Sequence, residues 1–284
     1  MDTAEDDYNS DDYLRTEHNR YWVRGKLDHD FGSNLWLRAD LDRASDRDYL
    51  QEIGGFANGF DESEDNFLLN YHRGLEEETL PYRTSQMQLT KFWSSSFVGG
   101  QFAGVDDLVG GDDDPSQVNT LPRLLYSGVL ELTDIPFGLS WDSSYVHYWR
   151  EDGVGEQRVD LYPEVIASLP LGHFFEGTVS SGVRETFYSI ESNGSSEPDW
   201  QYDDEQTRSA WDLNANIATT LERDFAMNIG SASSLNHSFR PEIGYTYLTV
   251  NAEDELPEID EIDILERGNS LSYGLNNYFR VSGA

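Results

Sequence analysis

The chain has no cysteine among its 284 residues. Without a thiol it cannot form a disulfide framework, a zinc-thiolate site or a cysteine nucleophile. Basic residues are also scarce, because 19 Lys and Arg stand against 54 Asp and Glu and give a formal net charge of −35. A surface this acidic repels phosphate backbones, so we expect no binding to nucleic acid.

Long apolar runs are missing as well. No stretch approaches the roughly 18 consecutive apolar residues of a membrane helix. Residues 1–17 are acidic and polar, whereas a secretory signal is basic and then apolar, so we expect either a cytosolic chain or an interior piece of a longer precursor. Low hydrophobicity and high charge are typical of disorder. However, aromatic residues make up 13% of the chain and recur along it, which indicates a folded protein.

Apolar and polar residues alternate with a period of two along much of the sequence, as in half-buried strands. The clearest segment is 209–222, whose apolar face carries Trp211, Leu213, Ile217 and Leu221. Similar runs cover 21–31, 35–42, 66–72, 85–93, 95–102, 124–132, 137–149, 158–167, 175–191, 235–250 and 271–281. Helical spacing is not sustained anywhere. The sequence therefore predicts an all-β fold of about twelve strands.

The connections between these runs are of two kinds. Short ones lie at 31–34, 134–136 and 170–173, and long acidic ones lie at 45–65, 104–119, 191–206 and 251–269. This alternation predicts a sheet with one plain end and one elaborated end. We expect residues 1–18 to form an acidic tail or loop and residues 19–284 to form one β domain, since no linker divides them.

Strand length favours a membrane protein over a soluble β-sandwich or propeller. Soluble strands run to about 5–6 residues, whereas a transmembrane β-strand needs about 9–11. Many runs here span ten residues or more, and several have an aromatic residue near one end: Trp22, Trp93, Trp149, Trp211 and Phe279. Such residues are typical of the aromatic girdles of an antiparallel transmembrane β-barrel.

An ordered series of short motifs resembles the LptD family of lipopolysaccharide-assembly proteins, also called the organic solvent tolerance family. The motifs are NRYW at 19–22, RASDRDY at 43–49, RVDLYP at 158–163, LERDF at 221–225, HSFRPEIGYTY at 237–247, LPEID at 256–260 and NSLSYGLNNYF at 269–279. Ala44 stands where the family usually has Val. The middle portion, 60–135, resembles the family only in the order and pattern of its strands.

The resemblance implies part of a large outer-membrane barrel that assembles lipopolysaccharide into the outer leaflet of the bacterial outer membrane, without catalysis. It also implies three partners: lipopolysaccharide, a plug lipoprotein similar to LptE, and a periplasmic transport bridge that is reached through an N-terminal domain. This sequence has no counterpart of that domain and ends before the family's closing strands.

We therefore expect the chain to be a fragment that contributes about twelve strands of a larger barrel. An incomplete sheet in lipid would leave backbone groups unpaired at a cost of several kcal/mol for each group. The expectation is that the chain alone does not insert as a stable monomeric barrel. Heat-modifiable migration on a detergent gel would contradict it.

Three sets of residues are candidates for a functional role. Arg184, Arg208, Asp212, Arg240 and Glu242 fall on the polar phase of their strands, where they can face the barrel lumen or the plug, or form a structural network. Pro163 and Pro241 are candidate strand breaks, because proline removes a ladder donor.

The third set is Asp112, Asp113 and Asp114, which are weak candidates for Ca²⁺ binding because they lack the order of ligands of an EF-hand loop. The six histidines lack paired metal-ligand spacing, so we expect no metal site, no cofactor and no enzyme. The alternatives that remain open are a generic outer-membrane porin and a soluble carbohydrate-binding β-protein.

Overall fold

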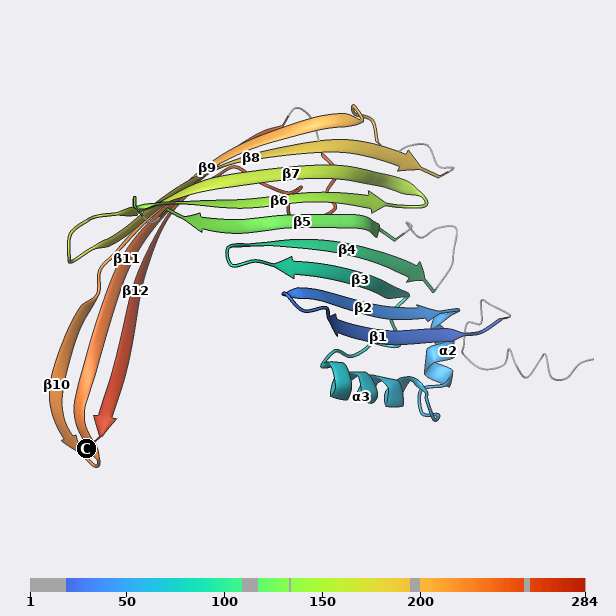
Figure 1. The fold of residues 1–284 in the computed structure, drawn as a ribbon, viewed down its shortest axis with the longest axis horizontal. Helices are drawn as coiled ribbons and strands as arrows, with labels where there is room; N and C mark the ends of the chain where they lie inside the picture. The colour runs from blue at the N-terminus through green and yellow to red at the C-terminus, as the bar shows by residue number, and fades with distance from the viewer. Residues whose placement is uncertain (1–18, 109–116, 133, 195–199, 253–255, 284) are drawn as a thin grey trace, which may run out of the picture. The chain divides into compact units, whose positions relative to one another are not determined.

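The computed structural model describes residues 19–108, 117–132, 134–194, 200–252 and 256–283 (Figure 1). Within these residues it has twelve strands and two helices. The strands are β1 (Trp22–Asp30), β2 (Leu35–Ala44), β3 (Tyr82–Phe92), β4 (Ser96–Asp107), β5 (Asn119–Glu131), β6 (Phe137–Trp149), β7 (Gly153–Leu169), β8 (Glu176–Asn193), β9 (Glu205–Ala218), β10 (Leu221–Ile229), β11 (Ala232–Ala252) and β12 (Gly268–Gly283). The helices are α2 (Arg47–Glu52) and α3 (Phe60–Tyr71). The fold is all-β, as predicted.

All twelve strands belong to one sheet. The order of hydrogen-bonded neighbours is β1-β2-β3-β4-β5-β6-β7-β8-β9-β11-β10. Strand β12 is not part of this order and pairs with β11. Consecutive strands are neighbours over most of the sheet, and the pairs β1–β2, β2–β3, β3–β4, β9–β11, β10–β11 and β11–β12 are antiparallel. This meander makes the described chain part of an antiparallel β-barrel wall.

The residues divide into two compact units. Unit 1 comprises residues 1–126, 144–159 and 188–205, and unit 2 comprises residues 127–143, 160–187 and 206–284. Unit 1 contains both helices, which lie beside β1 and β2 (Figure 1). Its apolar core is small and consists of Ala44, Leu50, Phe60 and Leu108, with Trp22 and Leu75 packed against it.

The prediction of a strand at 66–72 was wrong, as was the expectation that the chain has no helix. Residues 66–71 belong to α3, and a short apolar run does not distinguish a strand from a helix. Only Phe60 and Ser63 of α3 are buried, so the helix shows no broad apolar stripe for periodicity to detect. Asp61 and Glu62 in the first turn favour the helix by offsetting its dipole.

The predicted run 209–222 is interrupted in the structure. Strand β9 ends at Ala218 and β10 begins at Leu221, and both pair with the same side of β11. The tail predicted at 1–18 lies outside the described residues, as do Asp112, Asp113 and Asp114. In the described part of the chain, no helix is long and apolar enough to cross a membrane.

Candidate functional site

The two faces of the sheet differ sharply in unit 1. Leu27, Ala39, Met87 and Phe102 lie directly opposite one another across β1 to β4 and form one apolar row. Leu27, Met87 and Phe102 are large and exposed. On the other face, Lys26 lies opposite Asp40 and Asp28 lies opposite Arg38.

Unit 2 repeats this arrangement. Ile217, Ile243 and Tyr273 form an apolar row across β9, β11 and β12, and their exposed fractions are 46%, 59% and 84%. The neighbouring row on the other face consists of Asn216, Gly244 and Ser272. In each unit we call this side of the sheet the polar face. It carries Asn216 and Ser272 in unit 2 and Lys26, Asp28 and Asp40 in unit 1.

Burial is inverted relative to a soluble protein. The largest fully buried side chains include three arginines, Arg83, Arg158 and Arg208, whereas large apolar side chains are exposed along the strands. Charged residues are rarely buried in soluble proteins, and contiguous apolar surface marks contact with a partner or a membrane. A strand that is apolar outward and polar inward is typical of a transmembrane barrel. The polar face is therefore the candidate functional site.

In unit 2, a network of hydrogen bonds joins three strands on the polar face to the β11–β12 connection. Arg208 on β9 donates to the hydroxyl of Thr186 at 3.1 Å, and Thr186 on β8 donates to Asp160 on β7 at 2.8 Å. Arg208 also donates to the backbone carbonyl of Asp263 at 3.0 Å. The connection is thereby attached to the polar face by a fully buried guanidinium.

Asp263 also organises its own loop. Its carboxylate accepts hydrogen bonds from the backbone N–H groups of Ile259 and Asp260, each at 3.0 Å. Arg267 closes the base of the loop by donating to the carbonyl of Val250 at 2.7 Å. The described part of the connection is thus a folded segment with a fixed attachment to β9.

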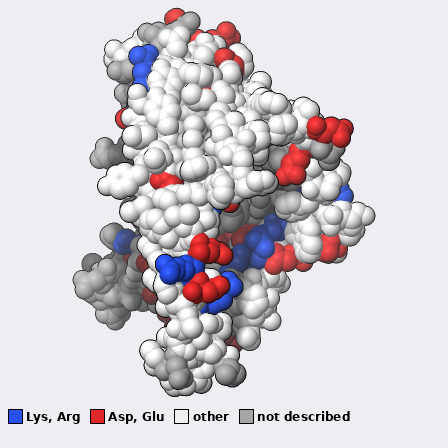
Figure 2. All heavy atoms as spheres, turned by 90° about the vertical axis from the view of Figure 1, so that its left-hand side faces the viewer, with Lys and Arg blue, Asp and Glu red and all other residues white. Residues whose placement is uncertain are grey.

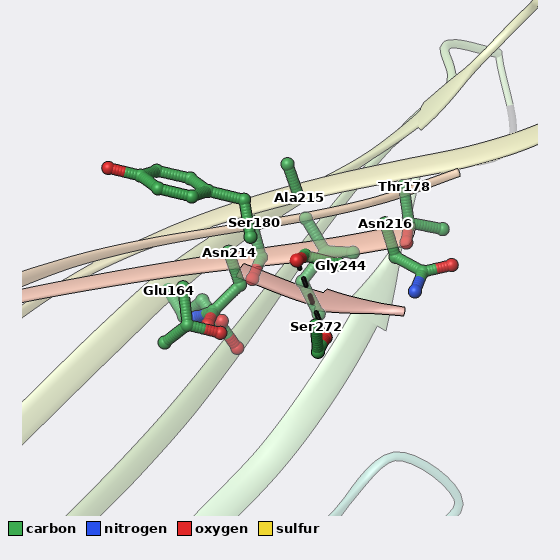
Figure 3. Close-up of a pocket in the computed structure, with 11 residues that line it drawn as sticks. Glu164, Thr178, Ser180, Asn214, Ala215, Asn216, Gly244 and Ser272 are labelled. Atoms are coloured by element: carbon green, nitrogen blue, oxygen red, sulfur yellow. Dashed lines mark hydrogen bonds between the residues drawn. The ribbon is translucent and has the colours of Figure 1, made fainter. Parts of the chain in front are cut away.

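A hollow of 360 Å³ lies on the polar face of unit 2 (Figure 3). It is lined mainly by uncharged hydrogen-bonding groups: Thr178, Ser180, Asn214, Asn216, Thr246 and Ser272, with one carboxylate, Glu164. Gly244 lies in the row between Asn216 and Ser272, and the Ser272 hydroxyl donates to its carbonyl at 3.3 Å. A Cβ at Gly244 would lie 2.7 Å from that hydroxyl, so glycine keeps the hollow open.

In unit 1, an arginine fixes the start of the segment that contains α2 and α3, which we call the helical segment. Arg20 donates to both oxygens of Asp46, at 3.0 and 2.7 Å, and it also pairs with Glu52. Asp46 in turn accepts from the backbone N–H of Tyr49 at 2.9 Å and so caps α2. Burial alone would raise the pKa of Asp46, but the hydrogen bonds from Arg20, Ser45 and Tyr49 outweigh it and hold that pKa below its usual value.

A second set of contacts holds α3 and the chain after it against β1 and β2. Arg24 donates to the hydroxyl of Ser63 at 2.7 Å, and Trp22 stacks on Phe60 at a centroid distance of 5.7 Å. Arg73 pairs with Asp28 and Asp40, each at 2.8 Å. The pKa of Arg73 is raised, chiefly by its hydrogen bond to Asp40. The helical segment therefore covers one part of the polar face of unit 1.

The five residues that were predicted to face the lumen or the plug make separate contacts in the structure. Arg184 pairs with Asp160 at 3.7 Å and stacks on Tyr162, while Asp212 accepts from the hydroxyl of Tyr162 at 2.9 Å. Arg208 belongs to the network with Thr186. All of these residues lie in unit 2 on the polar face.

Arg240 and Glu242 bond to different partners. Arg240 pairs with Glu176 at 2.7 Å and donates to the hydroxyl of Thr220 at 3.0 Å. Glu242 accepts from the side-chain amide of Asn276 at 3.2 Å. The five predicted residues thus do not form a single cluster.

The two prolines lie inside strands. Pro241 pairs with Leu275 of β12 in continuous register, and on its other side the partner of β11 changes from β10 at Phe239 to β9 at Glu242. Pro163 lies within β7.

Several residues of the site were missed at the sequence level, notably Asp46, Asp160 and Thr186. Asp46 follows Ser45 and precedes an acidic helical turn, which is a recognisable N-cap signal. Asp160 and Thr186 are ordinary polar residues in alternating runs. Only the register of three strands brings them together, and no local pattern marks them.

The described residues contain no group of three or more His, Asp or Glu side chains placed to hold a metal ion. In the view of Figure 2, acidic and basic side chains lie next to each other in a few groups, and broad uncharged areas separate them.

Comparison with known proteins points to one family. The family LptD, described as LPS transport system D, matches residues 18–283, which is nearly the whole chain. A search of curated proteins found no match.

Proposed function

Because the chain belongs to the LptD family, we propose that it forms part of the wall of a barrel that delivers lipopolysaccharide to the outer leaflet of the outer membrane. The family gives the chain a role in lipopolysaccharide transport and outer-membrane assembly. The single observation that carries the finer proposal is the inverted burial of the strands, with charged residues buried on one face and aliphatic residues exposed on the other.

The exposed apolar rows are proposed to contact the acyl chains of the membrane. A bilayer gives Leu27, Met87, Ile243 and Tyr273 the apolar surroundings that they lack in water. The polar face is then proposed to line the interior, where water and the sugar portion of lipopolysaccharide would pass. The hollow around Gly244, which is lined mainly by uncharged polar groups, supports this assignment, because hydroxyl and amide groups match the hydroxyl groups of a sugar.

The plug lipoprotein similar to LptE is proposed to bind the polar face of this barrel wall. The periplasmic bridge is proposed to connect through an N-terminal domain of the family. Arg184, Arg208, Asp212, Arg240 and Glu242 remain candidates for contact with the plug or with the sugar.

Depleting the protein from its host and following newly made lipopolysaccharide tests the proposal. We expect lipopolysaccharide to accumulate in the inner membrane and to return to the cell surface when the protein is restored. Loss of small-solute uptake with normal surface lipopolysaccharide would instead support the porin alternative and contradict the proposal.

A further inference from the structure

Three aromatic rings gather on the polar face of unit 1 near the short turns of β1–β2 and β3–β4. They belong to Trp36 on β2, Phe92 on β3 and Phe97 on β4. Phe92 lies directly opposite Phe97, with ring centroids 5.8 Å apart. Trp36 and Phe92 are 49% and 46% exposed, so about half of each side chain remains accessible.

These rings are not explained by the membrane. A girdle of aromatic residues belongs to the lipid-facing side of a barrel, whereas Trp36 alternates with Leu35 and Leu37 and so points to the polar face. They also differ from Trp22, which is covered by Phe60 of α3. Trp22 lies on the polar face as well, so the expectation that it belongs to a lipid-facing girdle was wrong. No described segment covers Trp36 in this way.

A cavity of 500 Å³ lies against these rings, within the range of about 300–1,000 Å³ that is usual for small-molecule sites. Its polar lining comes from Asp28, Arg38, Gln88 and Thr90. Arg38 lies opposite both Asp28 and Gln88, and Thr90 lies opposite Trp36, so these side chains form adjacent rows. Thr90 also lies opposite Gly99, which has no side chain to fill the cavity.

This combination fits a sugar ring best. A pyranose has C–H groups on its flat faces and hydroxyl groups around its rim. The C–H groups pack on an aromatic ring, and the hydroxyl groups can donate to Asp28 and Gln88 and accept from Arg38 and Gln88.

Two other ligands fit less well. An acyl chain would desolvate Asp28, Arg38 and Gln88 without giving them hydrogen bonds. A bare phosphate would not use the rings, and Arg38 is already paired with Asp28 at 3.2 Å.

We infer that Trp36, Phe92 and Arg38 form a saccharide-binding subsite on the polar face of β2–β4. The inference deepens the proposed function and rests on it for the source of the sugar, which is the core oligosaccharide of lipopolysaccharide. The subsite holds one sugar ring against Trp36 and orients it through Arg38 and Gln88.

Calorimetric titration with core oligosaccharide, released from lipopolysaccharide by mild acid, tests the subsite. The protein is held in micelles of a detergent without a sugar headgroup, so that the detergent does not compete. We expect Trp36→Ala to weaken binding about tenfold, or roughly 1.4 kcal/mol, and Trp36→Phe to retain most of the affinity. Trp93→Ala is the matched control, because Trp93 is 52% exposed next to the β3–β4 turn but does not line the cavity.

Circular dichroism establishes that each variant keeps its strand content. Equal affinity of Trp36→Ala and the unchanged protein for the oligosaccharide would overturn the inference. So would a loss of binding in Trp36→Ala that is seen with lipid A and not with the oligosaccharide, since that result would assign the rings to an acyl chain.

A second measurement separates this inference from the proposed function. If depletion of the protein blocks lipopolysaccharide delivery but Trp36→Ala binds oligosaccharide normally, only the subsite is refuted. If Trp36→Ala loses oligosaccharide binding but depletion leaves delivery unchanged, the subsite stands and the transport proposal fails.

Discussion

Tyr162 on β7 donates a hydrogen bond of 2.9 Å to Asp212 on β9 across the intervening strand β8. The residue between them is Gly182, and a Cβ there would lie 2.4 Å from the Tyr162 ring and 2.7 Å from the Asp212 carboxylate. Arg184 lies over the same ring at 4.4 Å. Because Gly182 has no side chain, polar groups from three neighbouring strands form one continuous layer on the polar face.

Gly182→Ala is expected to separate Tyr162 from Asp212 and to lower the stability of the protein. The added methyl group overpacks the layer, which typically costs about 1–3 kcal/mol. Tyr162→Phe removes only the hydrogen bond to the Asp212 carboxylate and should cost about 1.5 kcal/mol. Thermal unfolding in micelles, followed by circular dichroism, measures both. Gly268→Ala is the control, since a Cβ at Gly268 meets nothing within 4 Å; equal effects at the two glycines would contradict this account.

Asp46 makes the helical segment of unit 1 sensitive to acid. Its pKa in the folded protein is lowered, so its contribution to stability is present above the unfolded value of about 3.9 and is lost as the pH falls through the folded value. A carbon-detected NMR titration of the Asp46 carboxyl group measures the pKa directly.

Arg20→Met provides the comparison for Asp46. It removes both hydrogen bonds from the guanidinium and leaves the burial, so we expect the pKa of Asp46 to rise. An unchanged pKa in this variant would show that Arg20 does not stabilise the Asp46 carboxylate.

Arg208 is predicted to hold the β11–β12 connection in place. Arg208→Met removes the hydrogen bond to the carbonyl of Asp263, and a hydrogen bond to a charged group contributes about 1.5 kcal/mol. We expect cleavage after Glu258, Glu261 or Glu266 by a glutamate-specific protease to become about tenfold faster. Arg240→Met should not change this rate, because Arg240 bonds to Glu176 and Thr220. Equal rates for the two variants would refute the anchoring role.

The two faces of β11 should differ in their tolerance of charge. Ile243→Lys places an ammonium on the apolar face and is expected to destabilise the membrane-embedded protein by about 2 kcal/mol. Thr246→Lys places the same group beside the hollow on the polar face and should cost much less. Denaturant unfolding from liposomes compares them. A larger cost for Thr246→Lys would reverse the assignment of the faces.

The strands and their faces were predictable from the sequence because a period of two is a local property. Ile217 and Asp212 fall on opposite phases of one run, and the structure places the first on the apolar face and the second on the polar face. The helix α3 was not predictable in this way. It is attached through a few residues, such as Phe60 and Ser63, and not through an apolar stripe.

The contacts of the site depend on register, which the sequence pattern leaves open. The position of Arg208 in its alternating run predicted that it lies on the polar face. Its hydrogen bond to Thr186 depends on the alignment of β8 and β9, and its hydrogen bond to Asp263 depends on where the β11–β12 connection folds. The meeting of Tyr162 and Asp212 likewise requires Gly182 at one exact position between them. Alternation alone assigns these residues to a face and does not pair them.

The central claim is that one face of the sheet meets lipid and the other meets water. The absence of cysteine allows a spin label to be attached at a single introduced cysteine without background. In liposomes that contain the assembled barrel, labels at Ile243→Cys, Tyr245→Cys and Tyr247→Cys should be relaxed mainly by oxygen, which dissolves in the bilayer. Labels at Thr246→Cys and Leu248→Cys should be relaxed mainly by a water-soluble nickel complex. Alternation with a period of two along β11 is the predicted result, and equal accessibility of both sets to the nickel complex would contradict the account.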